Sequence, residues 1–131
     1  MALPSDLRHF RPWEFNHPER IDAQAALMLD EVRERFGQAL VVTDDARLPG
    51  QMPPGASAKS LHFLGQAFDL RIRHLSWGDL WRLVAACFAV AEELPPGHAM
   101  ELELVWSSRD KHCHLGLAMD GRRHRLIVQA D

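Results

Sequence analysis

Apolar positions recur at helical spacing in two segments of the chain. The first reads "RIDAQAALMLDEVRERFG", Arg20 to Gly37, and its final glycine suits the left-handed backbone that commonly ends a helix. The second reads "SWGDLWRLVAACFAVAEEL", Ser76 to Leu94. Ser76, with Asp79 three residues later, is typical of a capped helix start. We therefore predict two amphipathic helices.

Other segments alternate or are rich in branched apolar residues, which favours strands. They are Leu40–Thr43, Ala67–Arg73, Met100–Trp106, His112–Met119 and His124–Ala130. A turn at Asp120–Gly121 is predicted to link the last two strands. The order of these elements predicts an α+β domain with a mainly antiparallel sheet and flanking helices.

Composition is that of one folded domain. The 131 residues are 47% hydrophobic and 25% charged, so residues 1–131 can bury one core. A net charge of -3, with "GRRHRL" as the one locally basic stretch, gives no reason to expect nucleic acid. We expect no membrane insertion, because no apolar run reaches spanning length. The amino-terminal sequence lacks a signal pattern, so we expect synthesis in the cytoplasm without export by a signal peptide.

Polar residues on two of the predicted strands suggest chemistry. Alternation in "AFDLRIR" turns Asp69 away from its apolar neighbours, and alternation in "HCHLGL" does the same for His112 and His114. These two histidines are separated by about 6.6 Å along their strand. If the two strands are neighbours, the three side chains share a sheet face, and His62 lies just upstream of Asp69. Two histidines and a carboxylate form a ligand set that zinc accepts with a position left for water.

Spacing by itself leaves simpler readings open. A histidine pair on a polar strand face can be solvated, and His62 with Asp69 can be a hydrogen bond within a loop. A metal-free α+β domain with incidental histidines is therefore one alternative.

The stretch "SLHFLGQAFDL" resembles the signature Ser-x-His-x-x-Gly-x-Ala-x-Asp-Leu of the zinc D-alanyl-D-alanine carboxypeptidase and L-alanyl-D-glutamate endopeptidase family. That family includes vancomycin-resistance peptidases and phage endolysins, and its superfamily includes lysostaphin-like endopeptidases and the hedgehog amino-terminal domain. Six positions match without a gap, namely Ser60, His62, Gly65, Ala67, Asp69 and Leu70. The downstream "HCH" is similar to the His-x-His of the superfamily.

The resemblance implies one zinc ion on the open sheet face, held by His62, Asp69 and His114. It also implies that Arg47 and Ser60 contact the substrate. Around Arg47 the chain departs from the family, because "DDAR" stands where Ser-Gly-Tyr-Arg is usual.

The general base is less clear from the resemblance. Many family members carry an acidic residue three positions before the last ligand, where this chain has Lys111. His112, similar to the first histidine of the lysostaphin-type pair, is the first substitute that we predict, because its pKa suits proton transfer near neutrality. Asp110 is the second, and Glu103 on the adjoining strand is less favoured.

By resemblance we expect a zinc metallopeptidase that hydrolyses a peptide bond in the stem peptide of peptidoglycan. Without a signal peptide, action on the cell wall after release, or within a phage particle beside other phage proteins, fits best. A non-catalytic zinc-stabilised binding or structural module of the same fold is the alternative.

Overall fold

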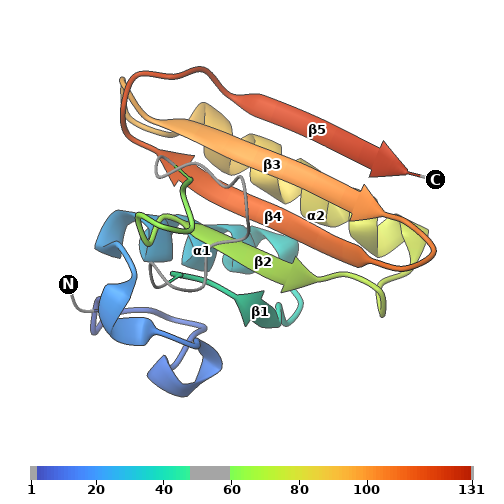
Figure 1. Cartoon of the computed structure of the whole chain (residues 1–131), viewed down its shortest axis with the longest axis horizontal. Coiled ribbons are helices and arrows are strands. Elements are labelled where there is room, and N and C mark those ends of the chain that lie inside the picture. The colour runs from blue at the N-terminus through green and yellow to red at the C-terminus, as the bar shows by residue number, and fades with distance from the viewer. Residues whose placement is uncertain (1–2, 48–59, 131) are drawn as a thin grey trace.

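The computed structural model describes residues 3–47 and 60–130. Its described part holds two α-helices and a five-stranded sheet of order β1-β2-β4-β3-β5 (Figure 1). The helices are α1 (Ala23–Phe36) and α2 (Trp77–Glu92), and the strands are β1 (Val42–Asp44), β2 (Ala67–Arg71), β3 (Ala99–Trp106), β4 (Lys111–Ala118) and β5 (Arg125–Ala130). The predicted α+β class is therefore confirmed.

Both helices begin and end where their sequences indicate. The Asp22 carboxylate accepts hydrogen bonds from the backbone N–H groups of Gln24 and Ala25 and so caps α1. Gly37 follows the last turn with φ 80, the left-handed conformation that its lack of a side chain permits. The Ser76 hydroxyl accepts from the Asp79 N–H at the start of α2, as predicted.

The sheet is mainly antiparallel. The pairs β1–β2, β2–β4 and β3–β4 are antiparallel, whereas β5 lies parallel to β3. The chain bends at Asp120 and Gly121 between β4 and β5, where a turn was predicted, but the two strands are not paired as in a hairpin. Both edges of β4 are already occupied by β2 and β3. The chain therefore passes over the start of β3, where the Gly121 N–H bonds to the Gly97 carbonyl, and enters the sheet at its outer edge.

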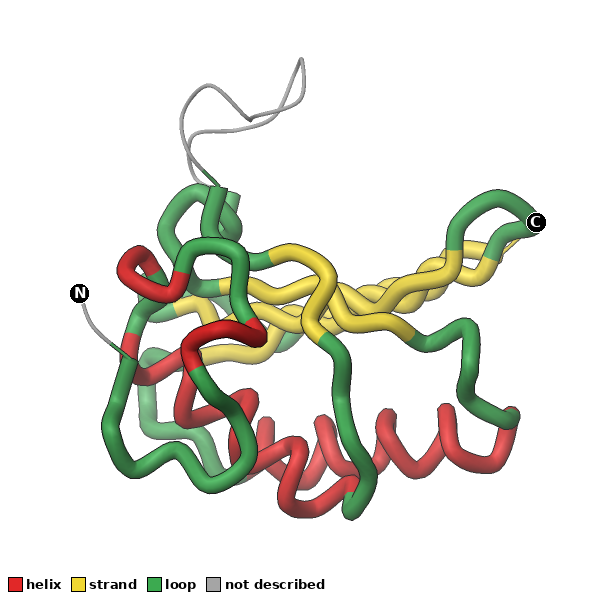
Figure 2. The backbone as a smooth tube through the Cα atoms, turned by 90° about the horizontal axis from the view of Figure 1, so that it is seen from below, coloured by secondary structure: helices red, strands yellow, loops and turns green. Residues whose placement is uncertain are grey.

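The two helices cover the same face of the sheet, and Figure 2 shows them together on one side. Between helices and sheet lies a core whose strand residues include Phe68, Leu70, Cys113, Leu115 and Leu117, each at most 1% exposed. Both cysteines, Cys87 and Cys113, are free and buried. The alternate side chains of β2 and β4 point to the other, uncovered face.

The amino-terminal lead-in (residues 3–22) wraps one end of this layer and contains the 3-10 helices η1 (Pro12–Glu14) and η2 (Pro18–Arg20). Phe15 is buried against Phe68, with ring centroids 6.0 Å apart. Gly65 lets the lead-in approach, since its φ is +72 and a Cβ there would lie 2.0 Å from the Arg20 carbonyl oxygen. No helix among residues 3–47 and 60–130 is long and apolar enough to cross a membrane.

Candidate metal centre

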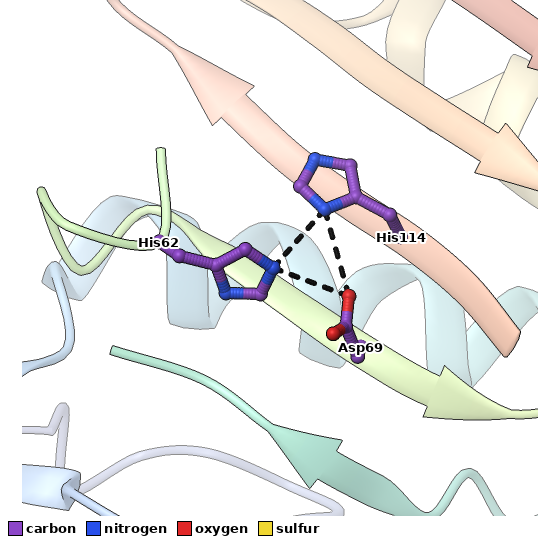
Figure 3. Close-up of side chains that lie close together, drawn as sticks. All are labelled: His62, Asp69 and His114. Carbon is purple, nitrogen blue, oxygen red and sulfur yellow. Dashed lines mark hydrogen bonds and ion pairs between the residues drawn. The ribbon is translucent and has the colours of Figure 1, made fainter. Parts of the chain in front are cut away.

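Strand register brings the three predicted zinc ligands together on the uncovered face. β2 and β4 are neighbours, and Asp69 lies directly opposite His114. His62 reaches the same point from the turn that precedes β2 (Figure 3). One ligand atom from each residue lies within 4.8 Å of the other two.

The His62 ring is held in one orientation by a backbone group. Its Nδ1 lies 2.8 Å from the Asp45 carbonyl oxygen, so Nδ1 carries the proton and donates it. The Nε2 lone pair then faces Asp69 Oδ1, at 3.2 Å. His62 is 4% exposed, so this geometry is fixed inside the protein.

The His114 ring is held through its other nitrogen, Nε2, and by a carboxylate in place of a carbonyl. Its Nε2 lies 2.8 Å from Glu101 Oε1, which leaves Nδ1 to face the centre. Nδ1 is 3.2 Å from His62 Nε2 and 3.6 Å from Asp69 Oδ1. A carboxylate or carbonyl that accepts from the far nitrogen is the usual second partner of a metal-binding histidine. Both imidazoles are therefore prepared to offer a lone pair to one point.

These separations fit a tetrahedral zinc ion. Ligand atoms about 2.0–2.1 Å from zinc at tetrahedral angles are about 3.4 Å from one another. The three separations here are 3.2, 3.2 and 3.6 Å. Two neutral nitrogen lone pairs at such a distance repel unless a cation lies between them. The residues thus fit a zinc ion, with a fourth position left for water or substrate.

Without metal, a proton takes the cation's place. Burial alone would lower the pKa of His114, but its hydrogen bonds to Asp69 and Glu101 raise it to about 9. Burial alone would raise the pKa of Asp69, but hydrogen bonds from His114 and His62 hold it well below its usual range. A metal ion that binds here must displace the His114 proton.

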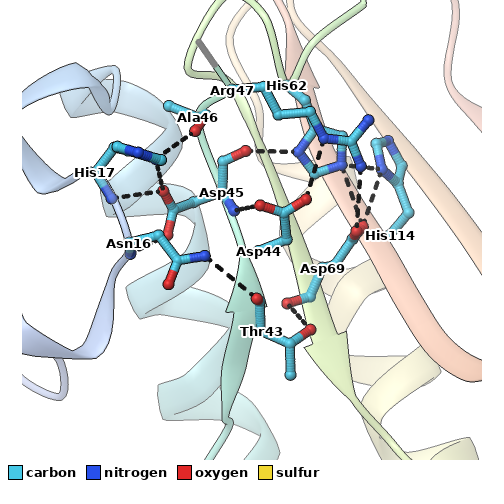
Figure 4. Close-up of polar contacts among 10 residues, drawn as sticks. All are labelled: Asn16, His17, Thr43, Asp44, Asp45, Ala46, Arg47, His62, Asp69 and His114. Carbon is cyan, nitrogen blue, oxygen red and sulfur yellow. Dashed lines mark hydrogen bonds and ion pairs between the residues drawn. The ribbon is translucent and has the colours of Figure 1, made fainter. Parts of the chain in front are cut away.

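Arg47 lies beside the three candidate ligands (Figure 4). Its Nε donates to Asp44 Oδ2 at 3.1 Å, and its Nη2 is 3.8 Å from Asp69 Oδ2. Its backbone N–H also bonds to the His62 carbonyl at 3.0 Å. Ser60 stands at the start of the His62 turn, where its carbonyl accepts from Leu64 N–H. The Ser60 hydroxyl makes no hydrogen bond to the three candidate ligands.

The two predicted proton-transfer residues pair with each other and are not part of the ligand cluster. His112 Nδ1 lies 3.0 Å from Asp110 Oδ1, at the start of β4, just after the turn that follows β3. Lys111, between them, has its ammonium 4.6 Å from the centre of the Trp106 ring. Trp106 also packs against Trp77 of α2, with the ring planes tilted by 41°, so Lys111 lies on the covered side and away from the ligands.

Two supporting residues were missed by the sequence prediction. Asp45 is fully buried, and its carboxylate accepts from the backbone N–H groups of Asn16, at 2.6 Å, and His17, at 3.0 Å. Its carbonyl holds His62. Glu101 was overlooked in favour of Glu103, which lies directly opposite His114 in register. Alternation in "ELEL" put both glutamates on the uncovered face, and the contact with His114 is made by the diagonal one.

Neither protein-family models, curated protein sequences nor solved structures yield a significant match to this chain. The resemblance to zinc peptidases therefore stays a prediction from the quoted motif, and the geometry of the candidate centre has to support any function independently.

Proposed function

We propose that this protein is a zinc metallopeptidase that hydrolyses a peptide bond in the peptidoglycan stem peptide. One observation carries the proposal: His62, Asp69 and His114 present two imidazole lone pairs and a carboxylate oxygen at zinc-like spacing. A single carboxylate ligand leaves a bound zinc site with net positive charge. Zinc bound there would polarise a carbonyl oxygen and lower the pKa of water toward about 7.

The residues around the centre have separate tasks in this proposal. His112 takes up a proton at Nε2, because Asp110 occupies its Nδ1 and fixes that tautomer. The Cα atoms of His112 and His114, two residues apart on β4, are separated by about 7 Å. Arg47 steadies Asp69 and offers its guanidinium to the substrate, and Ser60 contributes a hydroxyl at the entrance turn.

The test is incubation of the zinc-loaded protein with purified peptidoglycan, followed by mass spectrometry of new amino termini. We expect cleavage by the wild type, none by His62→Ala, and cleavage reduced by at least about a hundredfold for His112→Ala, within the range of general-base removal. Equal product from wild type and His62→Ala would contradict the proposal. Circular dichroism of each variant shows whether a loss of activity is a loss of fold.

A second function is favoured by one specific observation. The position that carries an acid in many similar peptidases holds Lys111, which is turned toward Trp106. The same fold can therefore act as a zinc-stabilised binding or structural module without turnover. In that case a chelator lowers the melting temperature strongly and peptidoglycan is bound without release of amino termini. The cell wall, reached after release or within a phage particle, is the proposed place of action in both cases.

A further inference from the structure

A hollow of about 290 Å³ lies beside the candidate metal centre, near the lower end of the range of ligand pockets, about 300–1,000 Å³. Its lining consists of Thr43, Arg71, Arg73, Asp110, Lys111 and His112. A second hollow of about 170 Å³ adjoins it and shares Arg73, Asp110 and Lys111. The turn that forms its wall is well defined, because the Ser107 hydroxyl accepts from Asp110 N–H at 2.9 Å.

Strand register fixes where this hollow lies relative to the ligands. On β2, Arg71 is two residues after Asp69, and its partner across the sheet is His112, just as Asp69 is paired with His114. The two pairs therefore form successive rows of the uncovered face, about 7 Å apart. If the scissile carbonyl of a peptide substrate lies at the metal centre, a substrate residue about two positions along the peptide can reach the Arg71–His112 row.

The charges of the hollow are unbalanced. Three of its six lining residues are cationic and one, Asp110, is anionic, in a chain whose net charge is -3. Asp110 is paired with His112, and the Lys111 ammonium is engaged by the Trp106 ring. Within residues 3–47 and 60–130, neither Arg71 nor Arg73 has a carboxylate within ion-pair distance.

Five other arginines differ from these two, because each is in an ion pair. Arg8, Arg35, Arg47, Arg82 and Arg122 each contact a carboxylate. Arg47, the arginine that the resemblance assigns to the substrate, already contacts Asp44 and approaches Asp69. Arg71 and Arg73, by contrast, line the hollow without an ion pair to any carboxylate of the described residues. A guanidinium is well suited to this, because its fork of donors matches a carboxylate bidentately.

We propose that Arg71 and Arg73 form an anion subsite that binds a free carboxylate carried by the substrate residue next to the scissile bond. This inference rests on the proposed peptidase function for the identity of its ligand. It names the substrate class as a peptide with a carboxylate that is not itself part of the cleaved bond. Asp110, held by His112, leaves the two guanidinium groups available to that carboxylate.

The experiment uses two pairs of short stem peptides. One pair contains an L-alanyl-D-glutamyl bond with the free carboxylate of glutamate either present or converted to its amide. The other ends in D-alanyl-D-alanine with a terminal carboxylate or amide. Binding is measured by calorimetry on the zinc-loaded protein at low ionic strength, and cleavage is followed separately by mass spectrometry. For any pair that is cleaved, kcat/KM replaces the dissociation constant.

In at least one pair we expect the carboxylate form to bind at least tenfold better than its amide. The double variant Arg71→Gln/Arg73→Gln is expected to remove that preference. The control is Arg123→Gln, which loses one positive charge from an exposed position in the loop between β4 and β5, and should keep the preference. Because Arg71 and Arg73 are exposed on the surface, the double variant should melt within a few degrees of the wild type.

Three results would overturn the subsite: equal binding of both forms, no binding of either pair, or a preference that survives in the double variant. The failure of the proposed function looks different. Preferential binding without new amino termini contradicts the peptidase and leaves the subsite intact. Cleavage without preference for the carboxylate leaves the peptidase and contradicts the subsite.

Discussion

The side chains of the central strands alternate between the two faces of the sheet, and the two faces are stabilised by different interactions. On the covered face, Phe68, Leu70 and Leu115 are fully buried beneath the helices, and their stability comes from removal of apolar surface from water. Asp69 and His114 alternate with these core residues along β2 and β4, so their side chains lie on the uncovered face. There they contact each other, and His114 also contacts Glu101. Changes on the covered face should therefore alter folding, and changes on the uncovered face should alter metal binding.

The largest effect is expected from Leu115→Ala. Leu115 is fully buried between His114 and Gly116, so its truncation leaves a cavity and should lower the free energy of unfolding by about 2–5 kcal/mol. Zinc affinity of the folded variant should stay within about twofold of the wild type. Leu126→Ala is the control, because Leu126 is 49% exposed and its loss should cost below about 1 kcal/mol. Urea titration and calorimetric zinc binding measure both quantities, and a large loss of zinc affinity in folded Leu115→Ala would break the separation of the faces.

The next effect is a pH dependence of the metal-free protein. The pKa of His114 is raised from 6.5 to about 9 in the folded chain, so between these values the folded chain holds a proton that the unfolded chain has released. This contribution to stability is fully present below about pH 6.5 and is lost as the pH rises to 9, by at most about 3 kcal/mol. Zinc should reverse the trend, since it binds better as the proton leaves. Melting curves with chelator and with zinc test this, and His114→Gln without metal should lack the slope.

A smaller effect is expected at Glu101. Glu101→Leu removes the acceptor that holds the His114 ring and should weaken zinc binding by about 10–100-fold. Glu101→Gln keeps an acceptor oxygen and should weaken it less. The two variants are compared by competition with a chromophoric chelator. If Glu101→Leu binds zinc as tightly as the wild type, Glu101 plays no part in orienting the ligand.

The smallest effect is expected for Lys111→Glu, which introduces the acid that the resemblance to zinc peptidases predicts at this position. The side chain is directed at Trp106 on the covered side, so the loss of that contact should cost below about 1 kcal/mol and zinc affinity should not change. Thermal melts and zinc titration measure these. A substantial change in zinc affinity would show that position 111 can reach the uncovered face.

Local patterns predicted the parts of the fold that local physics determines. Periodicity and capping located both helices, and alternation assigned Asp69 and His114 to the uncovered face. Alternation does not define register, however, so the direct pairing of Asp69 with His114, and the diagonal approach of Glu101, required the folded sheet. The pairing of β5 with β3 was not predicted either, because it depends on which strand edges are left unpaired by the other strands.

Asp45 was missed for a related reason. Its neighbours in space, Asn16 and His17, come from a lead-in nearly thirty positions away, and no pattern in "TDDAR" indicates that encounter. The structural reason for Gly65 was also not predicted. A glycine is required there because a side chain would collide with the Arg20 carbonyl oxygen. Such residues serve contacts between distant segments, which a single sequence does not reveal.

The double use of Asp45 links the amino-terminal lead-in to the metal centre. Its carboxylate ties down the backbone at Asn16 and His17, while its carbonyl sets the ring of His62. The orientation of the His62 ring is therefore linked, through this one residue, to the docked position of the lead-in. A chain clipped after residue 17 would lose both backbone donors to the Asp45 carboxylate, so an intact lead-in and a well-oriented His62 ring should be lost together.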